Sequence, residues 1–207
     1  ACGHHLFGAG SVAAAITVKN WLKESKTPGT IRLYGTPAEE GGGGKVFMVR
    51  SGLFDDVDAV LSWHPGNENS ADAGSSLAAM SARFRFKGVA AHAAGAPWMG
   101  RSALDGVEAM NYMVNMMREH VRPESRIHYA ILNGAKAANI VPAYAEASYI
   151  IRHPDMREVK KLFARVVNAS EAAAMGTETE VSHELIIGYF NKLPNQVLGE
   201  VMHKNLQ

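Results

Sequence analysis

The sequence predicts an α/β domain interrupted by an inserted α+β domain with the ferredoxin-like βαββαβ arrangement. Predicted helices and strands alternate over the first 64 residues, which favours an α/β layer with a mainly parallel sheet. From position 82 to 187 the order becomes strand, helix, strand, strand, helix, strand, which is the ferredoxin-like order. An amphipathic helix at 194–206 indicates a return to the first domain. We therefore expect the first domain at 1–76, the insertion at 77–190 and the return at 191–207.

The first 64 residues show the periodicities of two helices and two strands. Apolar residues recur at helical spacing across 11–26, and a shorter helix is predicted at 45–51, before Gly52. Short apolar runs at 30–35 and 58–63 are bounded by turn residues, so they predict buried strands.

The predicted insertion alternates between strand and helix periods. Ser102, with Asp105 three residues later, resembles a capping box at the start of one helix, and Asp155 is the expected N-cap of the other. The predicted strands are 82–87, 127–132, 144–152 and 177–187, and the predicted helices are 102–121 and 155–175.

Composition excludes several classes of protein. The 207 residues are 47% hydrophobic and 20% charged, with a net charge of +1, so the chain can bury a core and is not disordered. The near-neutral balance argues against nucleic-acid binding, and no apolar run approaches the roughly 20 residues of a membrane span. Cys2 is the single cysteine, which excludes an internal disulfide and suits the cytoplasm. Because the sequence opens without Met or a leader pattern, we expect a piece of a longer protein.

The first group of candidate ligands is Cys2 and His4. In an extended segment these two side chains lie on the same side, which is a workable geometry for metal ligands. The alternative is a small buried cysteine beside a hydrogen-bonded histidine.

The second group is Glu39 and Glu40, which follow a predicted strand and precede four glycines. Two adjacent carboxylates repel each other unless a cation offsets their charge, and the glycines permit a tight turn close to that cation. The alternative is a solvated acidic turn. His64 stands at the end of the other predicted strand, where a lone histidine is usually structural.

Taken together, these groups favour a metal site. Cys2, His4, Glu40 and His64 would meet at one edge of the predicted sheet, and such ligands suit Zn, Mn or a similar divalent ion. Glu39 is then left free beside the metal, where it could deprotonate a metal-bound water in a hydrolysis.

The insertion holds three further candidates. His92 lies in a loop of small residues, so it is expected to be exposed, with a loop hydrogen bond as the alternative. Asn139 in a turn and Arg152 at a strand end need no function by themselves.

Several motifs give the chain a resemblance to a known family, the aminoacylase/carboxypeptidase-type metallopeptidases. Within it, the chain is most similar to amidohydrolases of N-acyl and aryl-amide amino acids, and the similarity runs along essentially the whole chain. The motifs are Ala1-Cys2-Gly3-His4, Pro37-Ala38-Glu39-Glu40-Gly41-Gly42, Trp63-His64-Pro65, Gly88 to Ala93, Gly100 to Asp105 and Asn139-x-Val141-Pro142.

The resemblance implies a catalytic domain with two divalent metal ions, Mn or Zn, and a ferredoxin-like lid that dimerises. By motif match, the implied metal ligands are Cys2, His4, Glu40 and His64.

The same resemblance implies roles for the remaining candidates. Glu39 would be the general base, and His92 would stabilise the oxyanion, commonly across a dimer. Asn139 and Arg152 would hold the substrate, the arginine by its carboxylate. The implied substrate is a small-molecule amide such as p-aminobenzoyl-glutamate. The implied partner is a second copy of the chain or a second, different subunit, with no nucleic acid and no membrane.

Two departures from the family pattern bear on these expectations. His5 stands where Asp or Asn is expected, and a further histidine ligand from the C-terminal part of the catalytic domain has no match before Gln207. The alternatives are a non-catalytic homologue, an isolated lid that serves as a dimerisation module, and a metallocarboxypeptidase or dipeptidase acting on short peptides.

Overall fold

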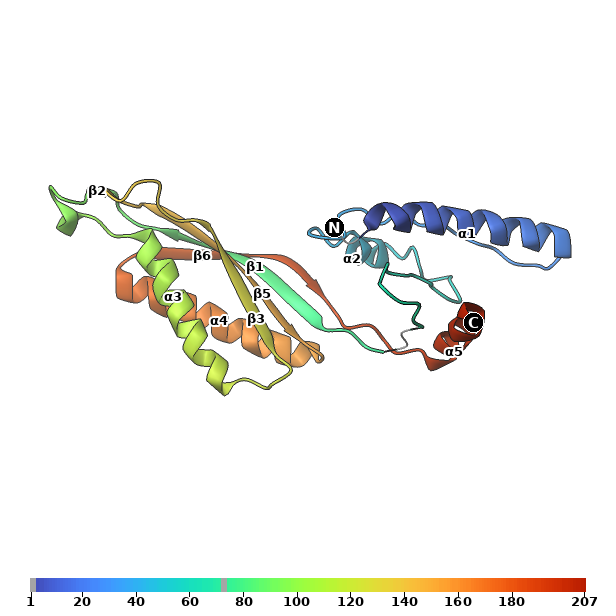
Figure 1. Cartoon of the computed structure of the whole chain (residues 1–207). Coiled ribbons are helices and arrows are strands. Elements are labelled where there is room, and N and C mark those ends of the chain that lie inside the picture. The colour runs from blue at the N-terminus through green and yellow to red at the C-terminus, as the bar shows by residue number, and fades with distance from the viewer. Residues whose placement is uncertain (1–2, 72–73) are drawn as a thin grey trace. The chain divides into compact units, whose positions relative to one another are not determined.

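The structure is a computed structural model that describes residues 3–71 and 74–207. The chain divides into two compact units, one formed by 1–73 together with 196–207 and the other by 74–195 (Figure 1). We call them the ligand unit and the sheet unit.

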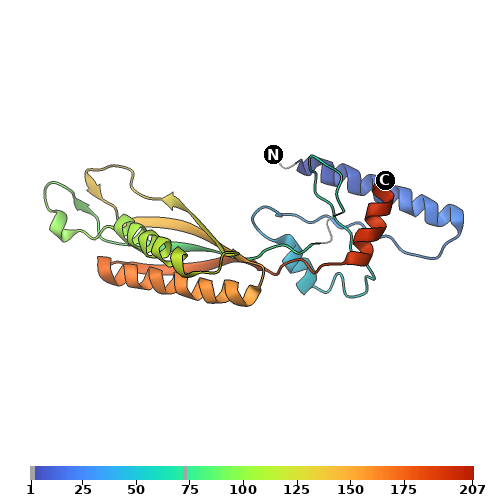
Figure 2. The same cartoon turned by 60° about the horizontal axis from the view of Figure 1, so that its bottom comes forward.

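The sheet unit is built on one four-stranded antiparallel sheet. Its strands are ordered β3-β5-β1-β6, and their sequence with the two helices is β1-α3-β3-β5-α4-β6. The predicted ferredoxin-like order of elements is therefore confirmed. Both helices pack on the same face of the sheet (Figures 1 and 2). The elements are β1 (Ala78–Lys87), α3 (Ala103–Met117), β3 (Arg126–Asn133), β5 (Tyr144–His153), α4 (Met156–Thr177) and β6 (Glu180–Tyr189).

The core lies between this sheet and its two helices. Phe84 and Phe86 of β1 are fully buried, whereas Arg85 between them points to the other face, as the period of a strand requires. Tyr149 of β5 is also fully buried, and its hydroxyl donates a hydrogen bond to the side-chain oxygen of Asn111 on α3. Because both groups are buried, this bond fixes the position of α3 relative to the sheet.

The predicted helix caps are confirmed. The backbone N–H of Asp105 donates to Ser102 Oγ at 3.1 Å, and the N–H of Arg157 donates to Asp155 Oδ1 at 2.8 Å. Each bond satisfies one of the donors left free at the start of its helix. Helix α3 ends at Met117, earlier than predicted, and continues as a 3₁₀ turn, η2, Arg118–His120.

A second, two-stranded sheet was not predicted from the sequence. It consists of β2 (Ala91–His92) and β4 (Ile140–Val141), and a 3₁₀ turn, η1 (Pro97–Met99), follows β2. The strands are too short to show a period of two, which explains why the sequence pattern did not indicate them.

The ligand unit differs from the prediction. Its helices are α1 (His4–Ser25), α2 (Gly44–Arg50) and α5 (Gln196–Leu206), and its described residues contain no strand. The predicted strands at 30–35 and 58–63, and the mainly parallel sheet built on them, are therefore wrong for this structure. A strand forms only where a neighbour pairs with its N–H and C=O groups, and neither segment has such a neighbour among the described residues.

The start of α1 is a further correction. The helix begins at His4 rather than at Ser11, after Gly3 in the left-handed conformation (φ 71°). His4 is therefore helical, so the prediction of an extended segment from Cys2 to His4 is wrong at His4. Within the described ranges, no helix combines the length and the hydropathy needed to cross a membrane.

Candidate metal centre

Three potential metal ligands meet in the ligand unit. His4 Nε2, at the start of α1, lies 3.2 Å from Glu40 Oε1 and 3.9 Å from Glu39 Oε2. One ligand atom from each of the three residues lies within 4.8 Å of the others. Nitrogen and oxygen ligands bind Zn at about 2.0–2.2 Å, so ligand atoms roughly 3–4 Å apart can share one divalent ion. The three residues therefore fit a metal of this class.

A tight turn positions the two carboxylates. Ala38 has a left-handed backbone (φ 55°), and its carbonyl accepts hydrogen bonds from Gly42 N at 2.9 Å and Gly43 N at 2.8 Å. A Cβ atom on Gly44 would lie 2.2 Å from the carbonyl oxygen of Pro37, so only glycine fits at that position. The glycine run thus folds the chain back on itself, as its sequence indicated.

His64 lies beside this group. Its Nδ1 is 2.8 Å from the carbonyl oxygen of Pro65 and must donate there, because a carbonyl only accepts. This bond leaves the Nε2 lone pair free for a ligand. The His64 and His4 ring centroids are 6.4 Å apart.

Phe7 connects the two imidazoles. Its ring centroid lies 5.1 Å from that of His4 and 5.3 Å from that of His64. It also contacts the ring of Trp63 at 5.4 Å, so one phenyl group packs against three rings of the site. No role for Phe7 was predicted from the sequence. It stands one helical turn from His4, which is the spacing that places two helical residues on one face.

Gly10 and Ser11 of α1 contact Trp63, in the segment that carries His64. Trp63 donates from Nε1 to Ser11 Oγ at 3.3 Å, and a Cβ on Gly10 would lie 2.8 Å from the Trp63 ring. A glycine inside a helix costs about 1 kcal/mol relative to alanine, so its presence there signals a close packing contact. That signal could have located the partner of α1.

The other candidates of this unit are less informative. Cys2 lies outside the described residues. His5 is exposed on α1.

In the sheet unit, His92 and Asn139 come together. His92 of β2 is opposite Ile140 of β4, and Ala93 N donates to Asn139 O at 3.0 Å. His92 Nδ1 accepts the backbone N–H of Gly95 at 3.0 Å. Its proton is therefore on Nε2, which is free to donate to a ligand.

Arg152 lies far from that pair within one chain. It is next to the last residue of β5, opposite Ala79, where the chain enters the sheet. His92 is in β2 and Asn139 directly precedes β4, and this two-stranded sheet lies beyond the other end of β5, where β5 begins at Tyr144 (Figure 1). From Tyr144 to Arg152, at about 3.3 Å per residue, the strand spans roughly 26 Å. The structure therefore does not bring Arg152 together with the other two predicted substrate-binding residues.

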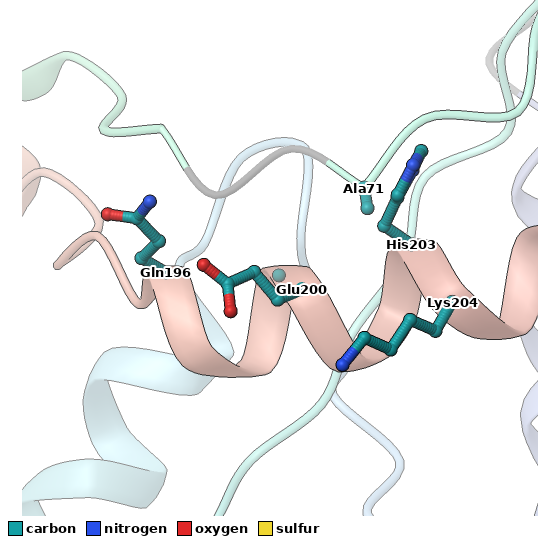
Figure 3. A pocket seen from close by; sticks show the side chains of 6 residues that line it. Ala71, Gln196, Glu200, His203 and Lys204 are labelled. Atoms are coloured by element: carbon teal, nitrogen blue, oxygen red, sulfur yellow. The ribbon is translucent and has the colours of Figure 1, made fainter.

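A pocket of about 340 Å³ is also present in the ligand unit, on one side of α5 (Figure 3). Glu200, His203 and Lys204 line it, together with Ala71. Figure 3 shows the side chains of Glu200, His203 and Lys204 projecting from α5. They do not form a second three-ligand group within the described ranges.

Comparison with known proteins extends these observations. Residues 76–178 match the peptidase dimerisation domain family. The chain is 47% identical to one of the subunits of p-aminobenzoyl-glutamate hydrolase from Escherichia coli over 99% of its length, which covers 43% of that protein. It is 35% identical to the Xaa-Arg dipeptidase of Mus musculus over 99% of its length, or 48% of that protein.

A solved structure shows the same relationship. The aminobenzoyl-glutamate utilization protein of Klebsiella pneumoniae superimposes with a TM-score of 0.63 and 25% identity, over 79% of this chain and 43% of that one. The chain thus spans less than half the length of these relatives.

Proposed function

We propose that this chain, which belongs to the aminoacylase/carboxypeptidase family of metallopeptidases, is part of a metal-dependent amidohydrolase that cleaves the amide bond of N-acyl or aryl-acyl amino acids. The observation that carries the proposal is the group formed by His4, Glu39 and Glu40. Two named relatives, a p-aminobenzoyl-glutamate hydrolase and an Xaa-Arg dipeptidase, support the reaction class. p-Aminobenzoyl-glutamate is the substrate we propose.

In this proposal, Cys2, His4, Glu40 and His64 hold two divalent ions, Mn or Zn. Such ions, when bound, polarise the substrate carbonyl and lower the pKa of water. Nitrogen and carboxylate donors suit these metals, and the free Nε2 atom of His64 supports its inclusion.

Glu39 is the proposed general base. Its carboxylate lies 3.9 Å from His4 Nε2, whereas that of Glu40 lies 3.2 Å away. The difference supports Glu40 as the metal ligand and Glu39 as the base. Glu39 would accept the proton of the attacking water and then deliver it to the amide nitrogen as the C–N bond breaks.

The sheet unit supplies the groups proposed to hold the substrate. His92 presents an Nε2–H donor for the oxyanion, Asn139 is its neighbour, and Arg152 would take the substrate carboxylate as a bidentate partner. Arg152 is at one end of strand β5, whereas His92 is in the two-stranded sheet beyond the other end of that strand. We therefore propose that the two groups acting on one substrate come from two chains.

The proposed dimer forms through strand β3, an edge of the sheet. Natural edge strands are usually protected by charge, but residues 129–133 of β3 carry none. Ile131 and Leu132 are exposed, as are Tyr112 and Met116 on the adjacent helix α3. This uncharged edge supports pairing with a second copy, or with a homologous second subunit.

A dipeptidase is the second candidate function, favoured by the 35% identity to an Xaa-Arg dipeptidase. It would keep the same metal chemistry and change only the substrate.

The test uses the full-length parent protein with Glu39→Gln. We expect hydrolysis of p-aminobenzoyl-glutamate to fall by about 100-fold or more while the metal content is unchanged. The exposed Glu24→Gln is the matched control. Wild-type protein that hydrolyses only dipeptides would favour the second function, and wild-type protein that binds metal but hydrolyses neither class would support a non-catalytic homologue.

A further inference from the structure

A second pocket, of about 220 Å³, lies in the sheet unit where η2 and the following loop lead into β3. Its polar lining comes from five side chains within one short segment, and we call it the arginine pocket. They are Arg118, Arg122, Ser125, Arg126 and His128.

Two of the guanidinium groups are held in place by neighbouring oxygens. Arg118 donates from Nε to Asn115 Oδ1 at 3.0 Å and from Nη1 to the carbonyl of Ile127. Arg126 donates from Nη1 to the carbonyls of Pro123, at 2.6 Å, and Ser125, at 2.8 Å. Each guanidinium keeps further N–H donors, so the two groups are oriented in advance for an acceptor.

Arg122 is the third cation of the pocket. Its side chain is exposed. The pKa of Glu158 on α4 is lowered mainly by a hydrogen bond from Lys161, and the positive charge of Arg122 lowers it further. No carboxylate is among the described residues that line the pocket. Three guanidinium groups thus face one small volume without a lining anion.

Ser125 provides an independent sign of a ligand. Its Oγ is buried and has no hydrogen-bond partner in the part of the chain that the structure describes. A buried hydroxyl without a partner is unfavourable, and an anion oxygen in the pocket would satisfy it.

The neighbouring strand adds to the positive charge. Arg126 is directly opposite Arg152 on β5, and like charges opposite each other across two strands are destabilising. A bound anion would relieve this repulsion.

We propose that the arginine pocket binds a phosphate-type dianion, either inorganic phosphate or the phosphate group of a monoester. A tetrahedral phosphate presents oxygens in several directions, which suits three guanidinium groups and one hydroxyl. A planar carboxylate has only two oxygens and would leave at least one of these groups unpaired. All of the residues that line the site belong to the sheet unit.

The experiment titrates inorganic phosphate, phenyl phosphate and glutarate into the isotope-labelled 207-residue chain, followed by NMR and calorimetry. We expect saturable shifts of the backbone amides of 121–128, apart from Pro123, which has no N–H, with phosphate. Arg122→Gln, at an exposed position, should weaken binding by roughly tenfold, and Ser125→Ala by about threefold. Arg50→Gln on α2 is the matched control and should bind as the wild type does.

The affinity for phosphate should fall as the salt concentration is raised. Phenyl phosphate binding as well as inorganic phosphate would identify a monoester site, and inorganic phosphate alone would identify a free-anion site.

Three results would overturn the proposal: no saturable shift of 121–128 at about 10 mM phosphate, an equal loss of affinity in the Arg50 variant, or tighter binding of glutarate than of phosphate. Unchanged amide spectra outside 121–128 in both pocket variants would show that their folds are intact.

Discussion

The Nε2 atom of His4 lies 3.2 Å from Oε1 of Glu40, which joins the first residue of α1 to the turn before α2. Glu39 extends the same group, so an imidazole and two carboxylates share one small volume. Two carboxylates this close to each other are stabilised by positive charge, which a divalent ion supplies.

Glu40→Ala should remove metal from the chain. We expect the metal content of the purified chain, measured by mass spectrometry after incubation with Mn or Zn, to fall by about tenfold or more, because an oxygen ligand is lost. Glu24→Ala, an exposed change on α1, should keep the wild-type content. Equal metal in both variants would contradict the ligand role.

Phe7→Ala should loosen the site without removing a ligand. The phenyl ring contacts both His4 and His64, so its loss frees two imidazoles to move. We expect metal affinity to fall by about tenfold, as for other residues that orient ligands. The control is Phe47→Ala, because Phe47 is exposed on α2. If Phe7→Ala bound metal as tightly as the wild type, the rings would not be positioned by this contact.

Leu132→Glu should dissociate the proposed dimer. The side chain is exposed on the edge strand β3, and a charge there opposes pairing with a second copy. Light scattering should give the mass of a monomer for this variant and of a dimer for the wild type. Leu185→Glu places the same charge on the opposite edge strand, β6, and should stay dimeric. A monomeric Leu185→Glu variant together with a dimeric Leu132→Glu variant would place the interface on β6.

Tyr149→Phe should destabilise the sheet unit. It leaves the buried side chain of Asn111 without its donor, which costs about 1–3 kcal/mol in the free energy of unfolding. Tyr112→Phe, at an exposed tyrosine on α3, should have little effect in the same urea titration. Equal stability of the two variants would show that the hydrogen bond contributes nothing.

The same tyrosine predicts a pH dependence. Burial raises the pKa of Tyr149 above its usual value of 10.0, so the folded state holds its proton more tightly than the unfolded state does. The stability that this provides is complete below pH 10.0 and is lost as the pH rises above it. Urea titrations at rising alkaline pH should therefore show a steeper loss for the wild type than for Tyr149→Phe. Parallel losses would assign the effect to other groups.

The sheet unit was predicted well because its local patterns are strong. Charged and aromatic residues alternate along β1 with the period of a strand, and Ser102 and Asp155 cap their helices with side chains close in sequence. In the ligand unit, the apolar runs at 30–35 and 58–63 resembled strands, but strand formation depends on a paired neighbour, which a short sequence pattern does not reveal.

The sequence by itself determined the kinds of ligand present, the glycine turn that presents Glu39 and Glu40, and the order of elements in the sheet unit. These properties depend on the chemistry and backbone preferences of residues near one another in the chain. Only the tertiary structure decided that Phe7 contacts both His4 and His64, and that His92 and Arg152 lie beyond opposite ends of strand β5. Those relationships depend on contacts between distant segments, which packing and strand pairing select.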